Sequence, residues 1–335
     1  MNVRNSSSSF LFTDAIIEAR KPLETVTRVE ITVNNNSNEC VDCVAFCPFD
    51  WASNLIAFES GAIGKLTLGL IKANDSNIEF QHIQDFIVGT KISCITWSPE
   101  TALASIPKLL KLAFSTVHTK RIHILKVVVK VQNTNDSSTQ KDDNCITLLD
   151  CKYGNHSSFV NDLVFEPQTG SLLASVGDDC FCCLWSATDG ALESRIRLMS
   201  AGSIVRWHPS EANKLLVAEK RGLIRLYNIE NKKPVISFEC NAFPLLAADW
   251  CLNNNLIIGA AVGSEIYIWN TSVSSMPIEK RMGHVQGCTK FTFFNDSVYC
   301  SRGRPGSRLQ VCNTKTGQRI SSPETVLRGI VNYRC

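Results

Sequence analysis

The sequence repeats one short pattern six times. In each copy, apolar and polar residues alternate and the run ends in an aromatic residue: Phe46, Trp97, Phe165, Trp207, Trp250 and Phe293. The intervals between these residues are 51, 68, 42, 43 and 43. A period of about 40–45 residues is typical of chains built from stacked units, each burying its apolar surface against its neighbours. The sequence therefore predicts a repeat architecture.

A second marker recurs in step with the first. Strand-like stretches end at Trp185, Tyr227 and Trp269, which are 42 residues apart, and short apolar runs such as LLASV lie between the two markers. The residues alternate with a period of two, as in strands, and no long stretch has the helical period of 3.6. The pattern predicts an all-β fold of the WD40-type β-propeller class.

Six blades are expected at roughly 40–73, 82–131 with 145–151, 160–198, 203–239, 244–281 and 284–322. The predicted organisation is a partly disordered N-terminal extension over residues 1–25 and a single β-propeller domain over residues 26–335. Within that domain, residues 132–144 (QNTNDSSTQKDDN) are polar and have few apolar side chains, so they are expected to form a flexible insertion between strands.

Closure of the ring leaves alternatives open. An open ring would expose sheet edges, which favour aggregation. The alternating segment Val26–Val33 can supply the outer strand of a last blade, and Pro323–Cys335 can supply one more strand. Either Phe10–Ala19 also contributes, or this seventh blade is incomplete. The sequence thus predicts a seven-bladed pattern in which six blades are readable and the N-terminal strand can clasp the ring.

The stretch LLASVGDDCFCCLW, residues 172–185, carries the most conspicuous polar residues. In WD40 blades, a Trp, a Ser, a His and an Asp form one hydrogen-bonded chain, in which Trp donates and the carboxylate accepts. Here Ser175 lies four residues before Asp179, Asp179 lies six before Trp185, and His156 precedes the blade. These four residues are predicted to be a structural tetrad. The next two blades have Arg221 and Gly263 in place of the Asp.

A catalytic or metal site in the same stretch is disfavoured. Asp178 and Asp179 are neighbours in sequence, so on a strand they would point to opposite faces. Cys180 and Cys182 are too close in sequence to form a zinc-chelating loop, and Cys183 would point the other way. Cys40 and Cys43 form a C-x-x-C with Cys47 nearby, but no second ligand pair follows, so buried core thiols are the favoured interpretation.

Other catalytic motifs fail at defined positions. The segment GAIGKLTLG, residues 61–69, has Glu59 and Leu66 where a phosphate-binding loop needs Gly and Ser or Thr. Neither G-x-S-x-G nor H-E-x-x-H occurs. The sequence predicts no catalytic residue, no metal ligand, no cofactor and no small-molecule substrate.

Composition and charge indicate the cellular compartment and bear on nucleic-acid binding. The chain has 15 cysteines, no apolar N-terminal run of signal-peptide length and no run long enough to span a membrane, so a reducing compartment, cytosol or nucleus, is expected. The net charge of 34 − 31 = +3 is too small for a general nucleic-acid binder. Residues 277–335 carry +7, and the loop Arg302–Arg308 is the most basic, but it has no aromatic residues to stack on bases, so an exposed turn is favoured.

Several whole phrases allow a more specific comparison. WSPETAL (97–103), FVNDLVFEPQTGSLLASVGDD (159–179), VRWHPSEANKLLVAEKRGLIRLYNI (205–229) and PLLAADWCLNNNLIIGAAVG (244–263) resemble the 37-kDa WD-repeat nucleoporin family of the nuclear-pore Y-shaped scaffold. The resemblance covers about residues 40–325. The extension before Val26 and the insertion at 132–144 are longer than in that family, and the C-terminus stops before the second and third strands of a seventh blade.

The resemblance implies a seven-bladed propeller without catalytic activity. A member of that family docks on the large short-arm scaffold nucleoporin beside other Y-complex subunits in the outer ring of the nuclear pore, supports nucleocytoplasmic transport, and in animals visits kinetochores in mitosis. Neither direct nucleic-acid binding nor membrane insertion is expected. Two other functions are compatible with a propeller: a WD40 adaptor in a ubiquitin ligase or chromatin complex, and an enzyme, which would need converging acids and histidines at the channel.

Overall fold

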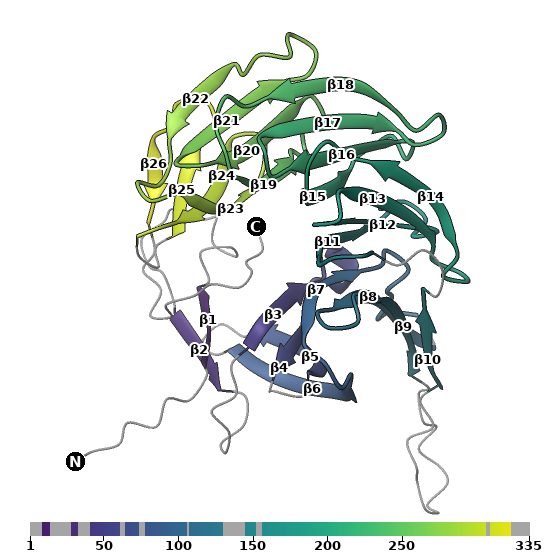
Figure 1. Cartoon of the computed structure of the whole chain (residues 1–335). Coiled ribbons are helices and arrows are strands. Elements are labelled where there is room, and N and C mark those ends of the chain that lie inside the picture. Colours follow the sequence, from purple (N-terminus) through teal and green to yellow (C-terminus); the bar gives the residue numbers. More distant parts are fainter. Residues whose placement is uncertain are drawn as a thin grey trace, which may run out of the picture.

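The fold is a ring of β-sheets. The computed structural model describes residues 9–13, 28–32, 41–60, 64–73, 78–105, 107–129, 145–151, 156–305 and 309–322. Within these ranges, one short 3-10 turn, η3 (Asp50–Ala52), is the only helical element. The strands form six antiparallel sheets of four strands each and one pair of strands. The six sheets follow one another around a common centre (Figure 1). This arrangement is the β-propeller that the repeat period predicts, and the all-β fold class is confirmed.

The first three blades lie between residues 41 and 197. The first comprises β3 (Val41–Phe46), β4 (Leu55–Ser60), β5 (Lys65–Ala73) and β6 (Ile78–Ile87). The second comprises β7 (Ile92–Trp97), β8 (Lys108–Thr116), β9 (Ile122–Val129) and β10 (Cys145–Asp150). The third comprises β11 (Val160–Phe165), β12 (Leu172–Gly177), β13 (Phe181–Ser186) and β14 (Leu192–Arg197).

The last three blades lie between residues 202 and 321. The fourth comprises β15 (Gly202–Trp207), β16 (Lys214–Glu219), β17 (Leu223–Asn228) and β18 (Lys233–Glu239). The fifth comprises β19 (Leu245–Trp250), β20 (Ile257–Val262), β21 (Glu265–Asn270) and β22 (Glu279–Met282). The sixth comprises β23 (Cys288–Phe293), β24 (Val298–Gly303), β25 (Leu309–Asn313) and β26 (Arg319–Ser321).

One predicted blade boundary was wrong. The segment beginning at residue 82 was assigned to the second blade, but β6 pairs with β5 along its whole length and is the outer strand of the first blade. The sequence QHIQDFI has no aromatic terminus of the kind that marks inner strands, and its residues are a mixture of exposed and half-buried positions. An outer strand needs only one covered face, which is why its apolar signal is weak.

The opening of the ring holds a separate pair of strands. β1 (Ser9–Thr13) pairs antiparallel with β2 (Arg28–Thr32). Figure 1 shows this pair between the first and sixth blades, and β2 contacts β6. The predicted strand at Val26–Val33 therefore pairs with the N-terminal segment rather than with the sixth sheet. Part of Phe10–Ala19 contributes a strand, but within the described residues this unit has two strands rather than four, so the two alternatives stay open.

The remaining predictions of organisation fall largely outside the described residues. The N-terminal extension over residues 1–25 contributes β1, and the rest of it lies outside them, as do the insertion at 132–144 and the segment Pro323–Cys335. The division of the chain at residues 25 and 26 stays a prediction.

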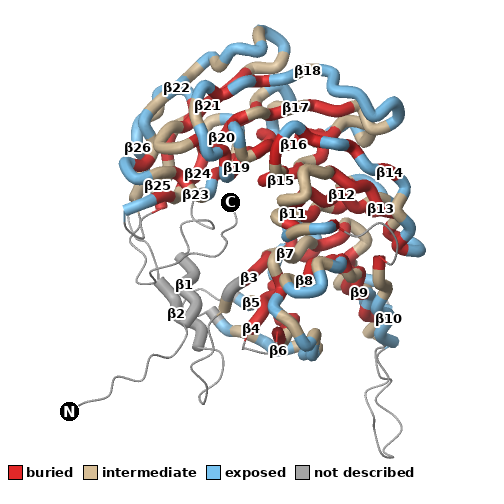
Figure 2. The backbone as a smooth tube through the Cα atoms, in the orientation of Figure 1, coloured by how far each residue is buried: buried red, intermediate tan, exposed pale blue. Residues whose placement is uncertain are grey.

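The hydrophobic core lies between the blades as well as within them. The inner strands contact one another in sequence order: β3 with β7, β7 with β11, β11 with β15, β15 with β19 and β19 with β23. Each main apolar cluster draws on two neighbouring blades, and Trp97, Trp185 and Trp269 are completely buried in these clusters. Burial is therefore continuous around the described ring, and exposure is concentrated on outer strands and loops (Figure 2). A blade cannot bury its surface alone, so the ring stabilises all six together.

Candidate functional site

The four residues of the predicted tetrad lie together in the third blade. The Trp185 indole N–H donates to Ser175 Oγ at 2.8 Å, and Ser175 Oγ lies 2.8 Å from His156 Nε2. On the other side of the imidazole, His156 Nδ1 lies 2.9 Å from Asp179 Oδ1. A neutral imidazole protonated on Nδ1 satisfies every contact, because the Ser hydroxyl then donates to Nε2 and Nδ1–H donates to the carboxylate. The chain of bonds runs from the blade core to its surface turn.

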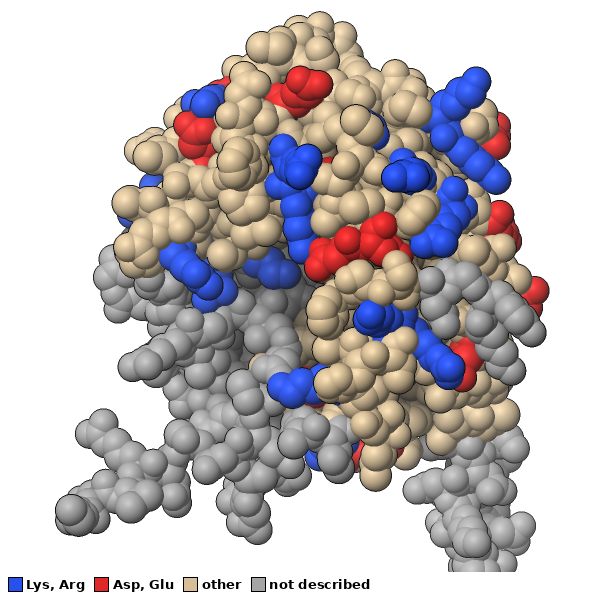
Figure 3. Space-filling view, viewed as in Figure 1, with Lys and Arg blue, Asp and Glu red and all other residues tan. Residues whose placement is uncertain are grey.

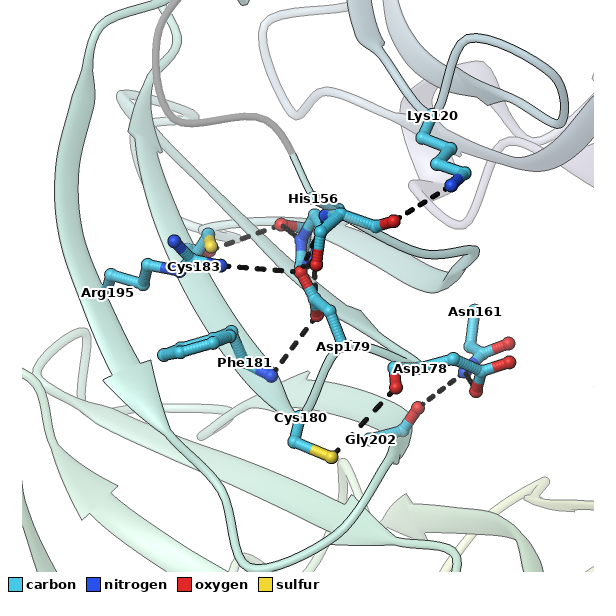
Figure 4. Close-up of polar contacts among 12 residues, drawn as sticks. Lys120, His156, Asn161, Asp178, Asp179, Cys180, Phe181, Cys183, Arg195 and Gly202 are labelled. Carbon is cyan, nitrogen blue, oxygen red and sulfur yellow. Dashed lines mark hydrogen bonds and ion pairs between the residues drawn. The ribbon is translucent and has the colours of Figure 1, made fainter.

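Asp179 is the most heavily used member of this network. Its carboxylate also accepts the backbone N–H groups of Ser157 at 3.0 Å and Phe181 at 3.2 Å (Figure 4). The Arg195 guanidinium lies 3.5 Å from Asp179 Oδ2 and stacks over the Phe181 ring. Burial opposes ionisation of Asp179, but the hydrogen bonds from His156 and the two backbone amides hold its pKa below the ordinary value. An ionised carboxylate with all its partners inside the blade is a structural group rather than a general base.

Asp178 points into a different network. Its Oδ1 accepts from Asn161 Nδ2 at 2.7 Å, beside which it lies in Figure 4, and from Lys220 Nζ at 2.6 Å. Asn161 also donates to the Gly202 carbonyl at 2.7 Å. Since Lys220 and Gly202 belong to the fourth blade, Asp178 joins two blades, whereas Asp179 organises one. The adjacent carboxylates do not share a site.

The cysteines next to these acids do not come together with other metal-ligating side chains in the described part of the chain. Cys182 and Cys183 are buried, and burial raises the pKa of Cys183 to about 12. Cys180 occupies the turn with φ of 61°, and its Sγ lies 3.9 Å from the Asp178 carbonyl oxygen. No group of three or more His, Cys, Asp or Glu side chains that could hold a metal ion occurs among the residues with described side chains. Cys43 and Cys47 are core thiols of the first blade, and Cys40 lies outside the described residues.

The other sequence motifs occupy ordinary structural positions. Gly64 lies in the turn before β5, with φ of 65°, and Lys65 begins that strand. The basic loop begins at Arg302 in β24 and continues to the exposed Arg304, and residues 306–308 lie outside the described set. No helix of the described segments is long and apolar enough to cross a membrane.

The fourth blade has a different network where the tetrad would stand. Glu219, fully buried at the end of β16, accepts the Ser200 N–H at 2.6 Å and lies 3.4 Å from the Arg225 guanidinium. Arg225 also donates to Tyr227 Oη at 3.2 Å. A carboxylate thus again ties the loop entering the blade to its β16–β17 end. This network could not be found from the position that corresponds to Asp179, because in the fourth blade the carboxylate belongs to strand β16 and not to the turn that follows it.

The sixth blade keeps half of a tetrad. His284 Nε2 lies 3.2 Å from Ser301 Oγ, and both residues are buried. Burial lowers the pKa of His284, which favours the neutral ring that this contact needs. The pair could have been found from the sequence, since Ser301 lies 126 residues after Ser175, three periods of 42.

A charged belt along the inner strands was also missed. Arg206 in β15 forms an ion pair with Asp162 of β11 and lies 3.6 Å from Asp249 of β19. Asp249 in turn accepts the Thr292 hydroxyl of β23 at 2.6 Å. Four consecutive blades are therefore linked by polar contacts at their inner strands. The belt is internally paired, so it offers no free catalytic group.

The indole of the tetrad gives a direct stability prediction. Trp185→Phe should lower the free energy of unfolding by about 1 kcal/mol more than Trp269→Phe, because only Trp185 loses a hydrogen bond. Both indoles are completely buried, and Trp269 Nε1 has no hydrogen-bond partner among the described residues. Gly259 occupies the position at which a Ser would accept the Trp269 indole N–H, and a Cβ there would meet Phe291 Cζ at 2.4 Å. Urea unfolding of both variants makes the comparison; equal losses would contradict it.

The visible surface has no broad field of one charge. Figure 3 shows basic and acidic side chains interspersed over the described part of one face, with uncharged residues covering most of it. Proteins that bind nucleic acids by charge carry a continuous basic surface. This face gives no support to a nucleic-acid interface.

Comparison with known proteins identifies close relatives. The chain is 32% identical over 314 residues to nucleoporin Nup37 of Homo sapiens, covering 89% of each chain. It is 32% identical over 253 residues to nucleoporin Nup37 of Drosophila melanogaster, covering 74% of this chain and 73% of that protein. A shorter match, 37% over 89 residues, is to an uncharacterised WD repeat-containing protein of Schizosaccharomyces pombe, covering 24% of this chain and 22% of that one. No protein-family model matches.

Proposed function

Because this chain belongs to the Nup37 family of nucleoporins, we propose that it is a non-enzymatic structural subunit of the nuclear pore complex. The observation that carries the proposal is the similarity to the human protein over 89% of both chains. Its place is the outer ring of the pore, at the nuclear envelope, where it supports nucleocytoplasmic transport.

The polar residues of the ring support a structural role. The groups that an enzyme would need, His156, Asp179 and Glu219, are bonded within their own blades. A rigid ring with internally paired charges binds partners by burying surface, with a few anchor residues contributing most of the affinity. The partner that we propose is the large short-arm scaffold nucleoporin, together with other subunits of the Y complex.

Affinity capture tests the proposed function. The tagged full-length chain, expressed in its own cells and purified after gentle lysis, should bring down the outer-ring nucleoporins in near-equal amounts. An unrelated tagged WD40 protein serves as the control for non-specific recovery. Recovery of ubiquitin-ligase or chromatin subunits in place of nucleoporins would overturn the proposal and favour an adaptor role.

A further inference from the structure

Two loops of the fifth blade form an exposed apolar surface. The loop between β19 and β20 exposes Leu252 by 76% and Leu256 by 42%; the connection between β21 and β22 exposes Val273 by 71%, Met276 by 65% and Ile278 by 52%. Both loops lie at the same end of the blade, and Thr271 N–H donates to the Leu256 carbonyl at 2.8 Å, so they are adjacent. We call these five residues the fifth-blade patch. The connection that enters β22 projects at the top of Figure 1, and Figure 2 shows little burial along it.

Charged residues are absent from both loops. Residues 250–258 (WCLNNNLII) and 270–278 (NTSVSSMPI) contain no Asp, Glu, Lys or Arg. The corresponding loops of the fourth blade carry Glu211, Lys214, Glu230, Lys232 and Lys233. Scattered apolar residues on a surface are normal, but a contiguous group without charges has the composition of the centre of a protein interface.

An ion pair borders the patch on the side of the fourth blade. Asn255 Nδ2 donates to Ser210 Oγ at 3.1 Å, which joins the patch to the fourth blade, and there Glu211 and Lys214 form an ion pair at 2.7 Å. In the chain, Glu279 follows the patch directly and forms an ion pair with Arg281. These bordering charges are paired, as in the polar rim of an interface whose centre is apolar.

The backbone of the two loops is already hydrogen-bonded. The Asn254 and Asn270 side chains accept from Leu256 N–H and Ser272 N–H, while the amides of Ile257, Val273 and Ile278 donate to carbonyls within the blade. Met276 N–H donates to Ser274 Oγ at 2.9 Å. An incoming strand would find few free donors, so strand addition is disfavoured. A suitable partner has its own backbone bonds satisfied, which is the property of a helix.

We propose that the fifth-blade patch binds an α-helix of another protein through an uncharged apolar stripe on that helix. The inference rests on the proposed function, in which the helix belongs to the large scaffold nucleoporin. An apolar stripe at helical spacing can cover side chains from both loops at once. A charged stripe would lose its hydration against the patch without gaining an ion pair.

Paired substitutions on opposite ends of the blades test the proposal. Leu252→Glu with Val273→Glu places two charges in the patch. Met199→Glu with Val285→Glu is the matched control, because those residues are 74% and 77% exposed in loops at the other end of the blades. Binding of each purified full-length variant to the purified large scaffold nucleoporin is measured by calorimetry. The patch variant should bind about 30-fold more weakly or worse, and the control should change less than about 3-fold.

Three results would overturn the inference. Equal affinity of wild type and patch variant would do so while leaving the proposed function intact. A control variant that loses as much affinity as the patch variant would also overturn the inference. Thermal unfolding of both variants is measured alongside, to check that each is folded. Failure of the wild-type chain to bind the nucleoporin would remove the proposed function and the inference together. Wild-type affinity should also change less than about 3-fold between low and high salt, since the patch carries no charge.

Discussion

Replacing Asp179 with alanine should lower the free energy of unfolding by about 3 kcal/mol or more, the effect expected for removing one member of a buried ionic network. The side chain is 1% exposed and accepts His156, Ser157 N–H and Phe181 N–H. Alanine would leave these donors without an acceptor and Arg195 without its carboxylate. Each unsatisfied buried donor costs about 1–3 kcal/mol. Urea unfolding followed by tryptophan fluorescence measures the loss.

The adjacent acid is the control. Asp178→Ala should cost about 1 kcal/mol, since that carboxylate is 31% exposed and its bonds to Lys220 and Asn161 are reachable by water. The dependence of the free energy of unfolding on pH in acid separates the two variants further. The pKa of Asp179 is held low, so its contribution is present above its unfolded pKa and is lost as the pH falls through the folded value. In Asp179→Ala, the free energy of unfolding should therefore fall less steeply than in wild type below about pH 4. Equal losses for the two alanine variants would contradict a dedicated role for Asp179.

Most of the fold could be predicted from the period of the repeat. Inner strands are largely covered on both faces and end in aromatic residues, so five of them lie within the predicted blades. From Phe165 onward these aromatic residues recur every 42 or 43 residues. Outer strands have weaker patterns because one face is exposed, which explains the misassigned β6. The pair of strands in the opening of the ring joins segments about 20 residues apart, β1 and β2, and the pattern of either segment alone does not specify their register.

The candidate site was predictable where one blade holds all its partners. His156, Ser175, Asp179 and Trp185 stand at fixed separations within about 30 residues, so the sequence places them together. The belt of Asp162, Arg206 and Asp249 joins three blades, and nothing in the local pattern requires those charges to meet. The fifth-blade patch was missed for a related reason, since an exposed Leu is apparent only once neighbouring chains are placed.

Replacing Glu219 with alanine should lower the free energy of unfolding by about 3 kcal/mol at pH 7, because Arg225 loses its buried counterion. The Arg225 side chain is 15% exposed, so little water can replace the carboxylate, and Ser200 N–H loses its acceptor as well. Glu219→Gln should cost only about 1 kcal/mol, since its amide oxygen can still accept from Ser200. Urea midpoints of the two variants at pH 7 measure the difference.

The pH dependence of the same pair of variants tests the cause. Burial raises the pKa of Glu219 above its ordinary value of 4.5, against the opposing effects of Ser200 N–H and Arg225. A carboxyl group whose folded pKa is raised contributes stability that is fully present below the unfolded pKa and is lost as the pH rises through the folded value. The stability advantage of wild type over Glu219→Gln should therefore shrink between pH 4.5 and pH 7. An advantage that grows over this range would mean that the ion pair with Arg225 outweighs the burial of Glu219, and that the fourth blade holds its carboxylate as firmly as the third blade holds Asp179.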